Sequence, residues 1–137
     1  MRYLGIDYGT RTVGLALSDE SGAFAFPQGT LPNDARLVGS VAALAREKGV
    51  QEIVVGDARS LGGAANPITA EVEEFAAALR AVTALPVTLA SEAWSSMEAA
   101  RYAPDNVKRD ESAAAVILQR FLDIHRGGSA KAKEGLE

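Results

Sequence analysis

Short apolar runs alternate with amphipathic segments along the chain, and their order predicts a mixed α/β fold. Residues 3–7 and 13–18 are apolar runs separated by a Gly-Thr-Arg-Thr turn, a pattern that predicts a β-hairpin. Residues 24–31 are expected to form a third strand. Pro27 indicates an edge position or a bulge for it, because proline has no N–H to donate to a neighbouring strand.

A helix and a buried strand follow this meander. Asn33 or Asp34 is expected to cap a helix that runs to about Lys48, because its apolar positions recur three and four residues apart and Gly49 can end it. Residues 52–56 are almost wholly apolar, which is typical of a strand buried on both faces.

The second half continues with helices and one more strand. The pattern predicts helices over residues 67–82, 95–102 and 110–126, and a strand over 86–90. The elements then follow the order strand-strand-strand-helix-strand-helix-strand-helix-helix. A meander that feeds two crossover units predicts a five-stranded mixed sheet with helices on its faces.

Length and composition limit the classes of protein that remain. The 137 residues suffice for one domain, expected over 1–128, with a frayed tail over 129–137. The chain has no cysteine, which excludes disulfides, thiolate metal sites and cysteine nucleophiles. No segment resembles a secretion signal or a membrane span, so we expect a cytoplasmic protein.

The net charge of −4 argues mildly against nucleic-acid binding, because affinity for phosphates comes largely from lysine and arginine. However, carboxylates that hold divalent cations make a nuclease more acidic overall than its binding face is. The net charge therefore does not exclude a nuclease.

Three carboxylates are expected at the ends of strands or helices in this fold. Asp7 ends the first strand, Glu92 follows the fifth, and Asp110 opens the last helix. They can converge at one edge of the sheet, where ligands of α/β proteins commonly bind. Such a cluster is suited to Mg²⁺ or Mn²⁺, and two ions can support phosphodiester hydrolysis without a side-chain nucleophile. The alternative is structural: a turn at Asp7, a solvated Glu92 and a helix cap at Asp110.

The order of motifs resembles a known family. Residues 4–19, Leu-Gly-Ile-Asp-Tyr-Gly-Thr-Arg-Thr-Val-Gly-Leu-Ala-Leu-Ser-Asp, resemble the N-terminal signature of the YqgF/RuvX family. Residues 110–119 resemble its C-terminal block, while residues 53–56 and 89–97 stand in the places of its other two. These are bacterial ribonuclease H-like proteins, described as Holliday junction resolvases and as nucleases that mature the precursor of 16S ribosomal RNA.

The resemblance implies a ribonuclease H-like fold in which Asp7, Glu92 and Asp110 are the catalytic acids. Asp7 would bridge two Mg²⁺ or Mn²⁺ ions, and the other two acids would complete the ligand set. The expected activity is phosphodiester hydrolysis in structured nucleic acid, with 5′ processing of precursor 16S rRNA as the first candidate. Holliday junction resolution is the alternative and requires a homodimer. A nucleic-acid- or partner-binding module with little catalysis is the alternative from another class.

This sequence also departs from the family pattern. Family members usually carry Asp-Glu-Arg where this chain has Ser91, Glu92 and Ala93. The loop after residue 56 lacks the usual Gly-Leu-Pro, and the segment before Asp110 has fewer basic residues than is usual. These changes retain the three acids, but they bear on substrate choice and on the strength of nucleic-acid binding.

Five further residues are candidates for contact with nucleic acid. Thr10 and Arg11 lie at the expected tip of the hairpin that follows Asp7, and an arginine there can bind a phosphate. The other three are basic residues expected near the acids: Arg59, Lys108 and Arg109. The alternative for all five is an ordinary exposed surface.

The first motif also has a competing interpretation. An Asp-x-Gly-Thr hairpin resembles the phosphate-binding loop of actin-like and sugar-kinase ATPases. That fold encloses its nucleotide between two such domains, and this chain has room for one. The length therefore favours the nuclease.

Overall fold

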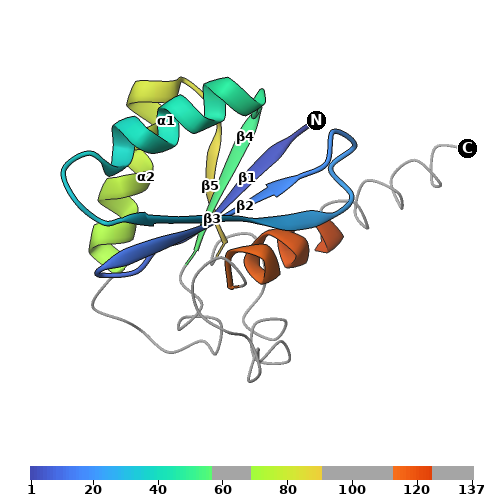
Figure 1. The fold of residues 1–137 in the computed structure, drawn as a ribbon, viewed down its shortest axis with the longest axis horizontal. Helices are drawn as coiled ribbons and strands as arrows, with labels where there is room; N and C mark the ends of the chain where they lie inside the picture. The colour runs from blue at the N-terminus through green and yellow to red at the C-terminus, as the bar shows by residue number, and fades with distance from the viewer. Residues whose placement is uncertain (57–68, 91–112, 125–137) are drawn as a thin grey trace, which may run out of the picture.

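The computed structural model describes residues 1–56, 69–90 and 113–124 (Figure 1). The strands are β1 (Tyr3–Asp7), β2 (Thr12–Ser18), β3 (Ala25–Pro32), β4 (Glu52–Gly56) and β5 (Val87–Leu89). The helices are α1 (Leu37–Lys48), α2 (Thr69–Thr83) and a helix over residues 113–124, called here the C-terminal helix. The helix expected over residues 95–102 lies outside the described residues.

The five strands form one mixed sheet in the order β3-β2-β1-β4-β5. β1 pairs antiparallel with β2, and β2 with β3, while β1 pairs parallel with β4, and β4 with β5. This arrangement confirms the predicted meander followed by two parallel crossovers. β1 is the centre of the sheet, so the last residue of β1 has a neighbouring strand on each side.

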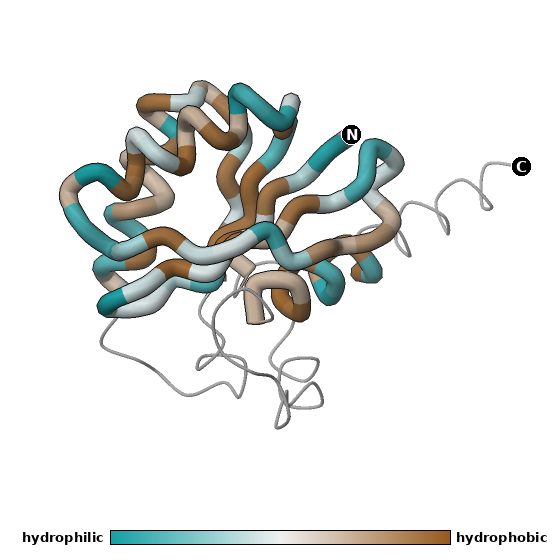
Figure 2. Tube along the Cα trace, in the orientation of Figure 1, coloured by the Kyte–Doolittle hydropathy of each residue, from teal (hydrophilic) through white to brown (hydrophobic). Residues whose placement is uncertain are grey.

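Helices cover both faces of the sheet. α1 and α2 lie on one face, and the C-terminal helix lies on the other (Figure 1). Hydrophobic residues follow the strands through the middle of the molecule and the helix sides that face them (Figure 2). One buried cluster fills each interface, which makes three layers: two helices, the sheet, and the C-terminal helix.

The C-terminal helix approaches the sheet closely. A Cβ added to Gly5 of β1 would stand 2.6 Å from the Cβ of Leu118 and 3.3 Å from the carbonyl oxygen of Ala114. Ala113 and Ala114 are almost completely buried. The small residues of this helix therefore allow close helix–sheet packing.

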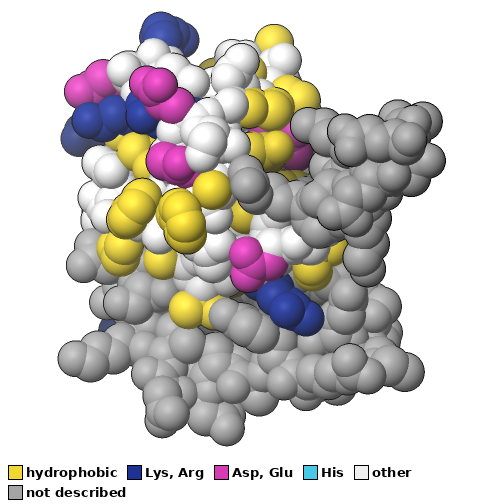
Figure 3. All heavy atoms as spheres, turned by 90° about the vertical axis from the view of Figure 1, so that its right-hand side faces the viewer, with side chains coloured by type: hydrophobic (Ala, Val, Ile, Leu, Met, Phe, Trp, Pro, Cys, Tyr) yellow, Lys and Arg dark blue, Asp and Glu magenta, His cyan; other side chains and the backbone are white. Residues whose placement is uncertain are grey.

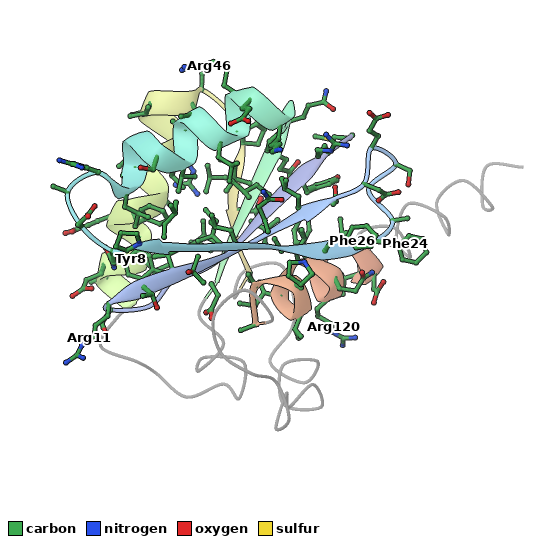
Figure 4. All side chains as sticks on the ribbon, in the orientation of Figure 1. Tyr8, Arg11, Phe24, Phe26, Arg46 and Arg120 are labelled. Carbon is green, nitrogen blue, oxygen red and sulfur yellow. The ribbon has the colours of Figure 1, made fainter. Side chains whose placement is uncertain are left out.

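β3 is an edge strand with an irregularity, as its proline predicted. Leu15 of β2 faces Gly29, but the next residue, Ala16, faces Pro27, so one residue of β3 is left without a partner. Phe24 and Phe26, at the beginning of this strand, are exposed and project from the same side of the molecule (Figure 4). On that side, hydrophobic side chains lie between a group of charged side chains at the upper left and an acidic and a basic side chain lower down (Figure 3).

The start of α1 differs from the expectation. The N-cap is Arg36, which makes no capping hydrogen bond through its side chain, so neither Asn33 nor Asp34 is the cap. Asp34 instead accepts a hydrogen bond from the N–H of Arg36, at 2.9 Å, in the turn before the helix. The predicted end is confirmed, because Gly49 has the left-handed backbone conformation (φ 69°) that glycine tolerates. No helix in the described part of the chain is long and apolar enough to cross a membrane.

Candidate active site

Asp7 is a buried carboxylate at the carboxyl end of the central strand. Its exposed fraction is 9%, and Ser18 is the only other buried polar residue in the described part of the chain. Leu4, Ile6 and Tyr8 pack into the core under α1 and α2. Because successive side chains of a strand point to opposite faces, Asp7 points to the other face, the one that the C-terminal helix covers.

Glycine flanks Asp7 on both neighbouring strands. Asp7 pairs with Gly14 of β2 and with Gly56 of β4. A Cβ at Gly56 would stand 3.0 Å from the Cβ of Ala90 and 3.2 Å from Cγ2 of Ile117. The two cross-strand neighbours thus place no side chain beside the carboxylate. The chain after β5 and the C-terminal helix both reach this part of the sheet.

The C-terminal helix runs antiparallel to β1. Near its end, Phe121 packs on the ring of Tyr3 at a centroid distance of 5.9 Å. One turn earlier, Leu118 lies against Gly5, and the carbonyl oxygen of Ala114, one further turn back, also lies near Gly5. The amino end of the helix is therefore directed toward the carboxyl end of β1, where Asp7 lies. Unpaired N–H groups give that end of a helix a partial positive charge.

The chain leaves the sheet one residue after Asp7. The N–H of Tyr8 donates to the carbonyl oxygen of Gly56 at 2.7 Å, which extends the pairing of β1 with β4 by one residue. The Tyr8 ring packs on Phe75 of α2 at a centroid distance of 5.1 Å. Tyr8 is therefore a core residue that fixes the position where the hairpin turn begins.

The turn itself is tight, and its tip is exposed. A Cβ at Gly9 would stand 2.4 Å from the carbonyl oxygen of Thr12, so only glycine fits there without a shift of the backbone. Thr10 and Arg11 are exposed, and Arg11 projects away from the fold at the end of the hairpin (Figure 4). An arginine in this position has its donors available to an anionic ligand.

The structure places three of the eight predicted site residues. Asp7, Thr10 and Arg11 lie together at the carboxyl end of β1. The other five lie outside the described residues: Arg59, Glu92, Lys108, Arg109 and Asp110. Within residues 1–56, 69–90 and 113–124, no three histidine, aspartate or glutamate side chains are grouped as metal ligands.

One residue of this region was missed from the sequence. The Nδ2 group of Asn33 donates to the carbonyl oxygen of Gly9 at 2.7 Å. The N–H of Asn33 donates to the carbonyl oxygen of Arg11 at 2.8 Å. The sequence offered no signal for these bonds, because they join segments more than twenty residues apart, and an asparagine before a helix is usually a cap.

Comparison with known protein families gives a match over nearly the whole chain. Residues 1–124 match the sequence model of the RuvX family, described as Holliday junction resolvase. A protein of Geobacillus kaustophilus named "Putative pre-16S rRNA nuclease" is 40% identical over 138 residues, covering 92% of this chain and 100% of that protein. One of the same name from Oleidesulfovibrio alaskensis is 36% identical, covering 90% and 93%.

Solved structures share the fold at low sequence identity. Thermus thermophilus RuvC aligns with a TM-score of 0.59 and 14% identity, covering 93% of this chain and 97% of that one. The same protein in complex with a Holliday junction substrate aligns with a TM-score of 0.55, covering 93% and 96%. These alignments confirm the predicted ribonuclease H-like fold.

Proposed function

The chain belongs to the RuvX family, and from that membership we propose that it is a divalent-metal-dependent nuclease that hydrolyses phosphodiester bonds in structured nucleic acid. The observation that carries the proposal is the placement of Asp7, a buried carboxylate between two glycines. The relatives named as nucleases support the reaction class.

The chemistry of the Asp7 position fits a magnesium or manganese ion. Both ions prefer oxygen ligands and usually retain several waters, which require space around the carboxylate. Gly14 and Gly56, the partners of Asp7 on the two adjacent strands, place no side chain of their own beside the carboxylate, and Ala90 and Ile117 pack over Gly56. When bound, the ions would lower the pKa of a coordinated water and stabilise the charge that develops on the phosphate oxygens.

The direction of the C-terminal helix supports Asp110 as a second acid of this site. The helix contacts β1 through Phe121 at Tyr3 and through Leu118 and Ala114 at Gly5, so its amino end is directed toward the carboxyl end of β1, where Asp7 lies. Asp110 is three residues before Ala113, the first described residue of that helix, and three residues span at most about 11 Å. A carboxylate at residue 110 can therefore reach the Asp7 position and serve as a further metal ligand.

Chain length supports Glu92 as the third acid. Ala90 follows β5 and lies beside Gly56, the strand partner of Asp7. Glu92 is two residues beyond Ala90, and two residues span at most about 7 Å. A carboxylate on that tether can reach the carboxyl end of β1. Asp7, Glu92 and Asp110 would then hold the divalent ions together.

The exposed hairpin tip is suited to holding the nucleic-acid backbone. Thr10 and Arg11 follow Asp7 within four residues and are exposed to solvent. Arg11 would bind a phosphate next to the scissile one, since its guanidinium matches two phosphate oxygens. Arg59, Lys108 and Arg109 are the further basic candidates.

The preferred substrate is the 5′ region of precursor 16S rRNA, and the site of action is the cytoplasm. The relatives' names favour this substrate. The family description favours a Holliday junction as the second candidate. Junction resolution requires two sites acting together in a homodimer, whereas trimming of RNA does not.

The test is Asp7→Asn, assayed with Mn²⁺ on a precursor 16S rRNA fragment and on a four-way DNA junction. Removing a carboxylate that would hold the ions is expected to lower kcat/KM by about a hundredfold or more, because the variant loses charge stabilisation in the transition state. The matched control is Glu47→Gln, an exposed carboxylate on α1, which should keep full activity.

The other outcomes of that assay separate the proposed nuclease from a binding module, and RNA processing from junction resolution. Full activity in Asp7→Asn would overturn the proposed site. If the wild-type protein binds RNA or DNA but cleaves neither with Mg²⁺ or Mn²⁺, the chain is a binding module. Comparison of the two substrates at equal concentration, together with the oligomeric state, separates RNA processing from junction resolution.

A further inference from the structure

Asn33 connects the loop before α1 to the turn that follows Asp7. It lies immediately after β3 and is partly buried. Its side chain donates to the carbonyl oxygen of Gly9 at 2.7 Å, and its backbone N–H donates to that of Arg11 at 2.8 Å. One residue thus holds the turn at two points.

The hairpin turn needs an anchor at this point of the sheet. The register of β2 with β3 ends at Thr12 and Pro32, and proline has no N–H to donate. Asn33 is therefore the first residue beyond that pair that can donate to the hairpin. On the other side of the turn, pairing with β4 ends at Tyr8. Between these two points, Asn33 joins the segment from Gly9 to Arg11 to the loop before α1.

The side chain of Asn33 makes this contact although a helix begins nearby. α1 starts at Leu37 with no side-chain capping bond at its N-cap Arg36. Asparagine is among the best capping residues, yet here its amide points to the hairpin. The side-chain amide of Asn33 is thus used to bind the carbonyl oxygen of Gly9 and not to cap α1.

We propose that Asn33 is a positioning residue of the nuclease: it fixes the Gly9–Arg11 turn so that Arg11 meets a phosphate of the nucleic acid at a set place relative to Asp7. This inference rests on the proposed function. Asn33 acts through the turn and does not contact the reacting atoms. A turn without this anchor would have to be ordered on binding, which costs conformational entropy and weakens the contact with phosphate.

The expected effect is on binding more than on the chemical step. Asp7 is held on both sides by its strand partners, Gly14 and Gly56, independently of Asn33. Loss of the anchor therefore leaves the carboxylate in place but loosens Arg11. This separation predicts a rise in KM with little change in kcat, because the lost interaction contributes equally to the bound substrate and to the transition state.

The experiment compares Asn33→Ala, Arg11→Ala and the double variant, using the substrate that the wild-type enzyme cleaves. Asn33→Ala should raise KM about tenfold and leave kcat within about twofold, as expected for loss of one phosphate contact. It should also reduce the slope of log affinity against log salt by up to about 0.9, although the net charge is unchanged. The double variant should bind no more weakly than Arg11→Ala alone.

Two more variants separate positioning from general loosening of the fold. Asn33→Asp keeps the shape but places an acceptor against the carbonyl oxygen of Gly9, so its KM should exceed that of Asn33→Ala. The control is Thr83→Val at the end of α2, far from the hairpin turn. Its hydroxyl donates to Leu79 and accepts from Leu85, so the control loses two local hydrogen bonds without a change in charge.

Thr83→Val should keep the wild-type KM and salt dependence, at a thermal stability similar to that of Asn33→Ala. A wild-type KM and salt slope in Asn33→Ala, with Asp7→Asn inactive, would overturn the role of Asn33 and leave the proposed function intact. An equal rise of KM in Thr83→Val would also overturn it. Activity in Asp7→Asn would instead contradict the proposed function itself.

Discussion

Gly5 of β1 lies directly against Leu118 of the C-terminal helix, with no room between them for a methyl group. The two Cβ positions would be 2.6 Å apart if residue 5 had a side chain. The Cβ of Leu118 is fixed to the helix backbone, so it cannot move away by a change of rotamer. This contact sets the distance between the central strand and the helix that covers the face of Asp7.

Gly5→Ala is expected to lower the free energy of unfolding by about 1–3 kcal/mol, because the helix must shift to admit the methyl group. Urea unfolding measures this loss. Gly39→Ala on α1 is the matched control: a Cβ there has nothing within 4 Å, so the same substitution should stabilise the helix by about 0.5–1 kcal/mol. Equal effects of the two substitutions would contradict the close packing at Gly5.

Divalent cations are expected to stabilise the folded protein through Asp7. At an Mn²⁺ concentration about a hundredfold above the dissociation constant, the free energy of unfolding should rise by about 2.7 kcal/mol. EDTA should reverse the gain, and Asp7→Asn should lack it, whereas Glu47→Gln should retain it. Thermal unfolding with and without metal measures this without reference to cleavage. An equal increase in the free energy of unfolding of Asp7→Asn on addition of Mn²⁺ would show that the ion binds at another site.

Asp19, in the turn between β2 and β3, predicts a pH effect on stability. The N–H of Phe24, the hydroxyl of Ser21 and the N–H of Ala23 donate to its carboxylate and hold the pKa of Asp19 well below its usual range. A depressed pKa in the folded state contributes stability above the unfolded value of about 3.9, and this contribution is lost as the pH falls below it.

Asp19→Asn should therefore be less stable than the wild type at pH 7, and the difference should shrink as the pH falls from about 4 toward 2. Urea unfolding at a series of pH values tests this. Glu20→Gln is the control, since the exposed carboxylate of Glu20 has a distant ion pair with Arg2 at 3.8 Å. A stability difference for Asp19→Asn that does not vary with pH would show that the carboxylate is not the cause.

Phe24 and Phe26 are exposed at the end of the sheet opposite to Asp7. Their exposed fractions are 62% and 56%, so replacing both with serine removes little buried surface. The double variant should change the free energy of unfolding by no more than about 0.5 kcal/mol per residue and should keep wild-type cleavage. Loss of cleavage in a folded variant would show that this surface takes part in the function.

The hydrophobic pattern was sufficient to predict the strands but not the contacts between distant segments. Each predicted strand lies within two residues of the observed one, because buried strands require apolar runs. The predicted N-cap of α1 was wrong: the cap is Arg36. The side chain of Asn33 donates to the hairpin turn, a tertiary contact that replaces the expected local cap.

The candidate site was predictable only in part, because contacts between distant segments also determine its arrangement. Asp7 could be placed at a strand end from the apolar run before it. The face to which it points depends on the packing of Leu118 over Gly5, which no local pattern reveals. The positions of Glu92 and Asp110 relative to Asp7 stay predictions, supported by the direction of the C-terminal helix and by the short tether from Ala90.

The C-terminal helix also determines when one face of the sheet is completed during folding. Gln119 of this helix donates to the carbonyl oxygen of Ala23 and accepts from the N–H of Ala25, so each bond joins residues more than ninety positions apart in the sequence. Contacts between such distant residues form slowly, because a long loop must close first. The face to which Asp7 points is therefore completed only when the C-terminal helix docks on the sheet.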